Sequence, residues 1–265
     1  MNKKKIIFFI NSLKFFISHR INIAEIAFEN NFEVIIVAKK DLHSLPDSIK
    51  SFKFIDLNIR NHNLFNEIKN ITQIRKIIQK YNPYICHFIT VKSIFYAALL
   101  SKFLKKTNSV LSFSGIGSIS SNKKIFSVIS KLIFYKALKK LSQIDNLRII
   151  FQNNDDKKLI KDYYNFNDEI SYTIPGSGIN LTEYSFRKLK DKNYINFLFA
   201  SRLLIDKGLM EFIKASQKIL DQGYKVTFTV IGEFDNSNPS IVNSNKIINW
   251  ADNKNKFFNN FQINV

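Results

Sequence analysis

Short apolar runs alternate with longer segments of helical periodicity over the first 180 residues of the chain. This alternation is typical of a parallel sheet whose strands are joined by crossover helices. The apolar runs predict strands at residues 4–11, 32–38, 52–57, 84–88, 109–113, 147–151 and 170–174. The periodic segments predict helices at residues 18–30, 64–81, 93–105, 123–142 and 155–163. Together these elements make one complete doubly wound α/β domain.

The alternation begins again after residues 180–192, a segment rich in charged and turn-forming residues. Residues 195–200 and 225–231 are predicted strands, and residues 207–220 a helix that ends at Gly223. Beyond Gly232 the pattern fades into Asn-rich sequence, in which residues 246–250 form a weak candidate for a third strand. We therefore place one domain at residues 1–185 and an incomplete second domain at residues 186–265.

The net charge of +19 indicates acidic partners such as phosphates, anionic lipid or nucleic acid. A solvated, lysine-rich surface explains the same charge equally well, since Lys, Asn, Ile and Phe are abundant throughout. No nucleic-acid recognition motif accompanies the charge, so we do not expect nucleic acid to be the partner.

The single cysteine and the apolar N-terminal run indicate the cellular compartment of the protein. Cys86, the single cysteine, lies in an apolar run and cannot form an internal disulfide, as expected for a buried thiol in a reducing compartment. The apolar residues 6–10 resemble a secretory signal, but Asn11, Ser12 and Lys14 interrupt them and no cleavage pattern follows. We predict a cytoplasmic protein without a transmembrane segment.

The candidate chemistry lies after predicted strands, where folds of this kind bind ligands. Arg202 follows the strand at 195–200, and Lys207 and Gly208 precede the next helix. A guanidinium and an ammonium beside a helix N-terminus suit a diphosphate, whose negative charge grows as it leaves a sugar. Two basic residues after a strand are more often ordinary surface charge. Whether they form a diphosphate site therefore depends on the context that the other segments of the sequence supply.

Seven short segments supply that context. The first, Asn11–Arg20, ends in Phe16-Ile-Ser-His19-Arg20 and so contains the pattern Phe-x-x-His-Arg. The others are Cys86–Lys92, Ser114–Gly117, Phe151–Asp156, Ile174–Asn180, Arg202–Glu211, and Ile231–Glu233 with Asn238-Pro239. In this order they resemble the CapM-like, capsular-polysaccharide branch of glycosyltransferase family 4, whose members are retaining enzymes of the GT-B fold.

The resemblance implies two Rossmann-like domains, the first binding mainly the acceptor and the second mainly a nucleotide sugar such as a UDP-sugar. It places Arg202, Lys207, Gly232 and Glu233 at the donor, together with Gly115 and Gly117 of the first domain, and His19 in the catalytic position. Arg20, His87 and Lys92 are assigned to the acceptor side. The acceptor would be a growing surface polysaccharide or a lipid-linked oligosaccharide, and neither a metal nor another cofactor is expected.

The chain departs from this pattern in its second domain. The family's Pro-Ser-x-x-Glu-Gly-like segment and its pair of glutamates do not occur, and no Glu follows Glu233. The sequence-based hypothesis is a C-terminally truncated glycosyltransferase with weak or no turnover. The alternative is a non-catalytic nucleotide-sugar-binding or membrane-binding fragment that pairs with a separate C-terminal half.

Two further interpretations stay open at this point. The helix at 123–142 carries Lys124, Lys131 and Lys139 on one side, so it either contacts anionic lipid at the inner face of the membrane or simply covers the sheet. His19 beside Arg20 is either a functional residue or one of an ordinary surface pair.

Overall fold

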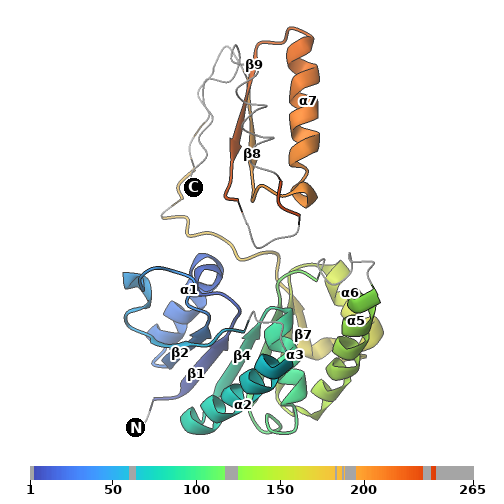
Figure 1. Ribbon diagram of the computed structural model, residues 1–265. Helices are drawn as coiled ribbons and strands as arrows, with labels where there is room; N and C mark the ends of the chain where they lie inside the picture. Colours follow the sequence, from blue (N-terminus) through green and yellow to red (C-terminus); the bar gives the residue numbers. More distant parts are fainter. Residues whose placement is uncertain are drawn as a thin grey trace. The chain divides into compact units, whose positions relative to one another are not determined.

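The computed structural model describes residues 3–59, 64–116, 125–182, 184–186, 188, 195–234 and 240–242. The chain divides into two compact units, Met1–Tyr184 and Ser185–Val265, which are drawn in Figure 1. Each unit contains its own parallel sheet.

The first unit is built on a seven-stranded sheet in the order β3-β2-β1-β4-β5-β6-β7, with every neighbouring pair parallel. Its strands are β1 (Lys5–Phe9), β2 (Glu33–Ala38), β3 (Lys53–Asp56), β4 (Ile85–Ile89), β5 (Asn108–Phe113), β6 (Leu147–Phe151) and β7 (Ser171–Thr173). The strand order reverses direction between β1 and β4. In doubly wound sheets ligands bind outside the carboxyl ends of the strands at such a reversal.

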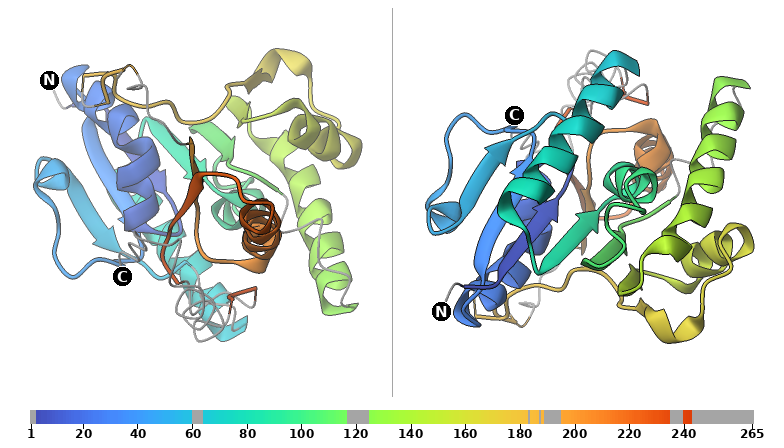
Figure 2. Two further views of the ribbon diagram at one scale, coloured as in Figure 1. Left: turned by 90° about the horizontal axis from the view of Figure 1, so that it is seen from above. Right: turned by 90° about the horizontal axis from the view of Figure 1, so that it is seen from below.

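Helices cover the two faces of this sheet unequally (Figure 1). Helix α1 (Leu13–Glu29) packs on one face, where its side chains join a cluster with alternate residues of β1 and β2. The opposite face carries α2 (Leu64–Tyr81), α3 (Val91–Leu99), α5 (Ile125–Leu138) and α6 (Asn154–Tyr163). Figure 2 shows the same elements from above and below. The predicted α/β architecture of the first domain is confirmed.

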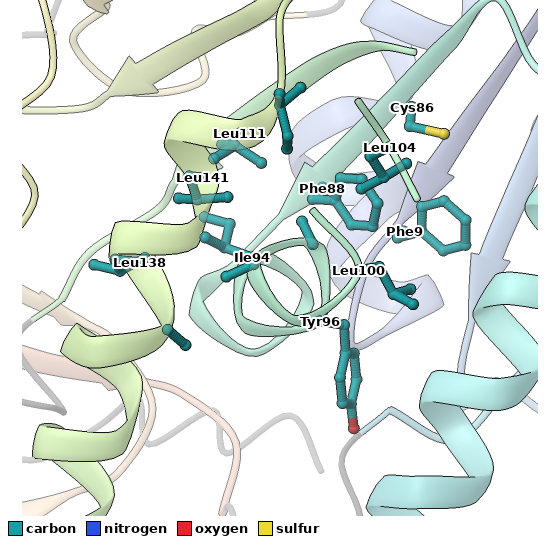
Figure 3. Close-up of a cluster of buried hydrophobic side chains, with 14 of the residues drawn as sticks. Phe9, Cys86, Phe88, Ile94, Tyr96, Leu100, Leu104, Leu111, Leu138 and Leu141 are labelled. Atoms are coloured by element: carbon teal, nitrogen blue, oxygen red, sulfur yellow. The ribbon is translucent and has the colours of Figure 1, made fainter. Parts of the chain in front are cut away.

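The larger hydrophobic cluster lies between the sheet and α3 and α5 (Figure 3). Phe9, Phe88 and Leu111 project into it from three strands, and Tyr96 of α3 is fully buried beside them. Cys86 is also fully buried there, and burial raises the pKa of its thiol. The near-continuous apolar runs of the strands are what a sheet covered on both faces requires.

Helix α1 begins five residues before the predicted start at Ser18. Ser12 caps it, because the Ser12 hydroxyl accepts a hydrogen bond from the amide of Phe15 at 3.1 Å, and the carboxylate of Asp41 accepts another from the amide of Lys14 at 2.9 Å. Such contacts satisfy amides that the first helical turn leaves without partners. His19 and Arg20 therefore lie in the interior of α1 and not at its start.

The second unit has two parallel strands, β8 (Ile195–Ala200) and β9 (Val226–Ile231), and helix α7 (Leu209–Asp221). Phe199, Phe212 and Phe228 pack together between the strands and α7. Ile195 and Leu198 of β8 remain more than half exposed. The weak strand candidate at 246–250 lies outside the described residues. Within the described part of the chain, no helix combines the length and apolar character needed to cross a membrane.

Candidate functional site

Arg20 is the central polar residue at the carboxyl edge of the first sheet. Its guanidinium donates from Nη2 to the Ser114 hydroxyl at 3.0 Å and from Nη1 to the Ser177 hydroxyl at 2.6 Å. A third hydrogen bond runs from Nη1 to the carbonyl of His19 at 3.0 Å. Ser114 directly follows β5, and Ser177 lies in the loop after β7, so this side chain links α1 to two distant segments of the chain. Only 7% of Arg20 is exposed.

His87 is the middle residue of β4, two residues before the strand ends at Ile89. Its Nε2 is 2.7 Å from the Ser112 hydroxyl, and its ring packs against Phe8. Burial, with a further contribution from the positive charge of Arg20, lowers the pKa of His87 to about 3. The imidazole is therefore neutral at physiological pH and lies beneath the surface of the edge.

Lys92 lies in the first turn of α3, the helix that follows β4. Its ammonium is 2.6 Å from a carboxylate oxygen of Glu67, whose other oxygen accepts the hydroxyl of Tyr96 at 2.5 Å. Burial, together with the Glu67 carboxylate, raises the pKa of Tyr96. Both side chains of the ion pair are mostly buried, so Lys92 is positioned firmly by α2 and does not extend freely into solvent.

Two oxygen atoms lie at the ends of the strands between which the sheet order reverses. Asn11 follows β1 and Thr90 follows β4, and Asn11 Oδ1 and Thr90 Oγ1 are buried without a hydrogen-bond partner in the described structure. Thr90 also has φ 78° and ψ 153°, a backbone conformation that normally requires glycine and costs about 1–3 kcal/mol. Strain and unsatisfied oxygens at a strand end are typical of binding sites.

His19 and Gly115 are exposed near this edge. The imidazole of His19 stacks on Phe15 with ring centroids 4.3 Å apart, and its Nδ1 is 2.6 Å from the Ser18 hydroxyl. Gly115 has φ 95°, and a Cβ added to it would meet no atom within 4 Å, so open space adjoins this loop. Gly117, the other glycine of the predicted donor loop, lies outside the described residues.

The predicted donor residues of the second unit are brought together at the carboxyl edge of its sheet. The amide of Ser201 donates to the carbonyl of Ile231 at 3.1 Å, and the amide of Leu203 donates to the carbonyl of Glu233 at 3.1 Å. These bonds hold the loop after β8, which contains Arg202, against the loop after β9. Arg202 and Glu233 are both exposed there.

Lys207 stands one residue before Gly208, the residue that caps α7 with φ 79°. Lys207 is exposed beside the N-terminus of α7, where the partial positive charge of the helix dipole adds to the charge of its ammonium group. The loop is held in place by Asp206, whose carboxylate accepts the Ser240 hydroxyl at 2.6 Å. Lys207 and the helix N-terminus thus provide positive groups at this end of α7, alongside the carboxylates of Asp206 and Glu211.

Gly232 is required by close backbone approach. A Cβ at this position would lie 1.8 Å from the carbonyl oxygen of Ser201, well inside any real contact distance. Glycine therefore allows the two loops of the second unit to lie edge to edge. This explains the Ile231-Gly232-Glu233 segment by packing, whatever ligand binds there.

Ser114 and Ser177 were not singled out by residue in the sequence-based assignment. Both lie in segments that carry the family resemblance, and each stands beside a glycine. A small hydroxyl residue next to a glycine after a strand is the signal that could have identified them. Among the described residues, no three His, Cys, Asp or Glu side chains gather into a metal-binding group.

Each of the two units has a parallel sheet with candidate site residues at its carboxyl edge, an arrangement typical of the GT-B fold. The family model described as Glycosyl transferase 4-like matches residues 5–153, more than half of the chain. The chain belongs to this family. None of the curated proteins matches the sequence.

Solved structures agree with this fold. A glycosyltransferase from Rickettsia africae ESF-5 is 18% identical with a TM-score of 0.63, covering 96% of this chain and 66% of its own. A sucrose-phosphate synthase from Thermosynechococcus elongatus is 12% identical with a TM-score of 0.70, and the match covers 99% of this chain and 71% of that chain. The MnaA-UDP co-structure of S. aureus is 12% identical with a TM-score of 0.58, and the match covers 99% of this chain and 69% of that chain. The chain thus spans about two thirds of their lengths, and identities this low compare the fold alone.

Proposed function

We propose that the protein transfers a sugar from a nucleoside-diphosphate sugar to a hydroxyl group of an acceptor. The observation that carries this proposal is the carboxyl edge of the second unit's sheet, where Arg202, Lys207 and the N-terminus of α7 provide positive groups. When the bond between the sugar and the diphosphate breaks, negative charge develops on the departing diphosphate. Fixed positive groups lower the energy of that transition state.

A UDP-sugar is the proposed donor. UDP is present in the S. aureus MnaA co-structure, which shares this fold. In this assignment Arg202 and Lys207 contact the diphosphate, whereas Gly232 and Glu233 lie at the nucleoside. Glu233 is acidic and so suits the hydroxyl groups of a ribose better than the phosphates. Gly115 and Gly117 are assigned to the donor from the side of the first unit.

The acceptor is assigned to the first unit, at the edge where β1 and β4 end. Asn11 Oδ1 and Thr90 Oγ1 lack hydrogen-bond partners within the described structure and can accept from sugar hydroxyls. His19, with its Nδ1 beside Ser18, can present Nε2 to a substrate hydroxyl. We propose a growing surface polysaccharide or a lipid-linked oligosaccharide as acceptor, and transfer with retention, from the likeness of the seven segments to CapM-like enzymes.

Contact with a membrane surface is proposed for α5. Leu132 and Ile133 are more than half exposed, and Lys136, Lys139 and Lys140 are exposed close by. Apolar side chains flanked by lysines suit the surface of an anionic bilayer, where a lipid-linked acceptor would be found.

Titration of the 265-residue chain with UDP tests the donor site. Replacing both Arg202 and Lys207 by Ala should weaken UDP binding by about tenfold or more, because two charge-assisted contacts to phosphate are lost. The measurement is isothermal titration calorimetry at fixed salt concentration.

The matched control is Lys214→Ala with Lys218→Ala. It removes the same amount of charge from exposed positions farther along α7. UDP affinity should stay within about twofold of the unmodified protein in this control. Equal losses in the two double variants would show that net charge, and not this site, binds the nucleotide.

A further inference from the structure

Arg20 carries a buried positive charge that nothing in the described structure neutralises. Its three hydrogen bonds go to two hydroxyls and one carbonyl, all of them uncharged groups. The ion pairs made by Lys50, Lys92, Lys157 and Lys161 lie elsewhere in the structure. The nearby His87 is neutral or positive at any pH, so it cannot offset the charge. A buried charge without a counterion is strongly unfavourable, which indicates that an anion belongs here.

The groups around Arg20 can all donate hydrogen bonds to such an anion. Ser114 and Ser177 accept from the guanidinium through their oxygens, which leaves each hydroxyl hydrogen able to donate outward. The guanidinium itself has further N–H groups beyond the three hydrogen bonds it makes. No carboxylate stands among these partners to repel an anion. A cluster of donors around a fixed positive charge is the arrangement that binds oxyanions.

The site is open to solvent on its outer side. Ser114 and Ser177 are half-buried, whereas Gly115, Gly176 and Gly178 beside them are exposed. All three glycines have positive φ, and a Cβ added to any of them would meet no atom within 4 Å. The loops after β5 and β7 therefore leave room for a ligand to reach the two hydroxyls from outside.

We propose that Arg20, Ser114 and Ser177 bind a phosphate group of the acceptor. This inference rests on the proposed function, and it defines the acceptor as a sugar phosphate or a phosphate-linked saccharide. The donors come from three separate segments of the chain and so approach an anion from different directions. A phosphate offers three strongly accepting oxygens to such a set, whereas a planar carboxylate offers two.

The inference gives the Arg20 site and the donor site different ligands. The Arg20 site lies wholly in the first unit, and Arg202 and Lys207 lie in the second. Glucose 1-phosphate and inorganic phosphate are suitable probes of the first site, and UDP is the probe of the second. If the phosphate bound by Arg20 instead belonged to the donor, UDP binding would depend on Arg20 as well.

The experiment measures binding of glucose 1-phosphate, inorganic phosphate and UDP to the full chain by calorimetry, with Arg20→Gln and Ser177→Ala as variants. We expect Arg20→Gln to weaken both phosphate probes by about tenfold or more and to leave UDP affinity unchanged. Ser177→Ala, which keeps the charge, should weaken the phosphate probes by a smaller factor. The Arg202→Ala, Lys207→Ala variant should show the opposite selectivity.

Thermal unfolding supplies an independent readout. Phosphate should raise the melting temperature of the unmodified protein and should not raise that of Arg20→Gln, because a ligand stabilises the state that binds it. If Arg20→Gln does not fold, Ser177→Ala takes its place, and phosphate should raise its melting temperature less than that of the unmodified protein.

The outcomes separate this inference from the proposed function. Unchanged phosphate binding in both variants, or no binding to the unmodified protein, overturns the phosphate site while leaving the UDP result intact. Loss of UDP and phosphate together in Arg20→Gln assigns the phosphate to the donor and overturns the acceptor assignment. If UDP binding is lost only in the double variant Arg202→Ala, Lys207→Ala, and phosphate binding is lost only in Arg20→Gln, the phosphate site and the proposed function are both supported.

Discussion

Burial controls the protonation of His87. With its pKa lowered to about 3, the folded protein keeps this imidazole neutral, whereas the unfolded chain has the ordinary value of 6.5. Below that ordinary value the unfolded state binds a proton that the folded state does not. The free energy of unfolding of the first unit should therefore fall by about 1.5 kcal/mol between about pH 6.5 and about pH 5. Urea denaturation at a series of pH values measures it.

The matched variants are His87→Gln and His43→Gln. His43 is exposed in a loop, so its replacement should leave the pH dependence as it is in the unmodified protein. In His87→Gln the fall above about pH 5 should disappear, since no imidazole remains to take up the proton. A fall of the same size in His87→Gln would show that other groups cause it.

The exposed face of α5 leads to a prediction at the level of a single helix. The full chain should sediment with vesicles that contain anionic phospholipid and should remain in solution with vesicles of neutral phosphatidylcholine. Replacing Leu132 and Ile133 by Ser should reduce the bound fraction about tenfold, because two apolar side chains leave the bilayer surface. Cosedimentation at low salt measures the bound fraction.

The control for this prediction is Ile23→Ser with Ile26→Ser in α1. These isoleucines are 40% and 58% exposed, similar to Leu132 and Ile133, but they lie on the helix that covers the other face of the sheet. Binding should survive in this control. A comparable loss in both double variants would mean that general surface hydrophobicity, and not α5, causes the association.

The elements themselves were largely predictable from the sequence. Strands buried on both faces appear as apolar runs, so β5, β6 and β8 lie within one residue of their predicted ranges. The predicted start of α1 was wrong because the helix begins at Leu13, with only three residues between it and the end of β1 at Phe9. The cap is made by Ser12 and Asp41, residues 29 positions apart, and the second of these contacts is not visible in a local pattern.

At the scale of the whole molecule, the site was only partly predictable. Arg202, Lys207, Gly232 and Glu233 fall at one edge because consecutive strands of a parallel sheet end on the same side. The partners of Arg20 were missed because Ser177 is 157 positions away, and which hydroxyl meets the guanidinium depends on how three segments pack. The burial of His87 has the same origin, since it depends on α1 and β5 together.

The division of the chain into two units predicts that damage to one leaves the other intact. The clusters of the first unit contain no residue of the second, and the cluster around Leu209 contains none of the first. Gly232→Ala forces a Cβ against the Ser201 carbonyl, so it should greatly increase hydrogen exchange in β8 and β9. Exchange in β1, β4 and β5 should not change. Mass spectrometry of peptides after exchange measures both.

Gly223→Ala is the matched control, because it adds the same methyl group to the same unit. Gly223 has φ 82° and open space around it, so alanine there meets no atom and costs only about 1–2 kcal/mol for the left-handed backbone. Its effect on exchange in β8 and β9 should be small beside that of Gly232→Ala. Faster exchange in β4 and β5 of the Gly232→Ala protein would show that the two units unfold as one cooperative body, and the separate treatment of their binding sites would then have to be given up.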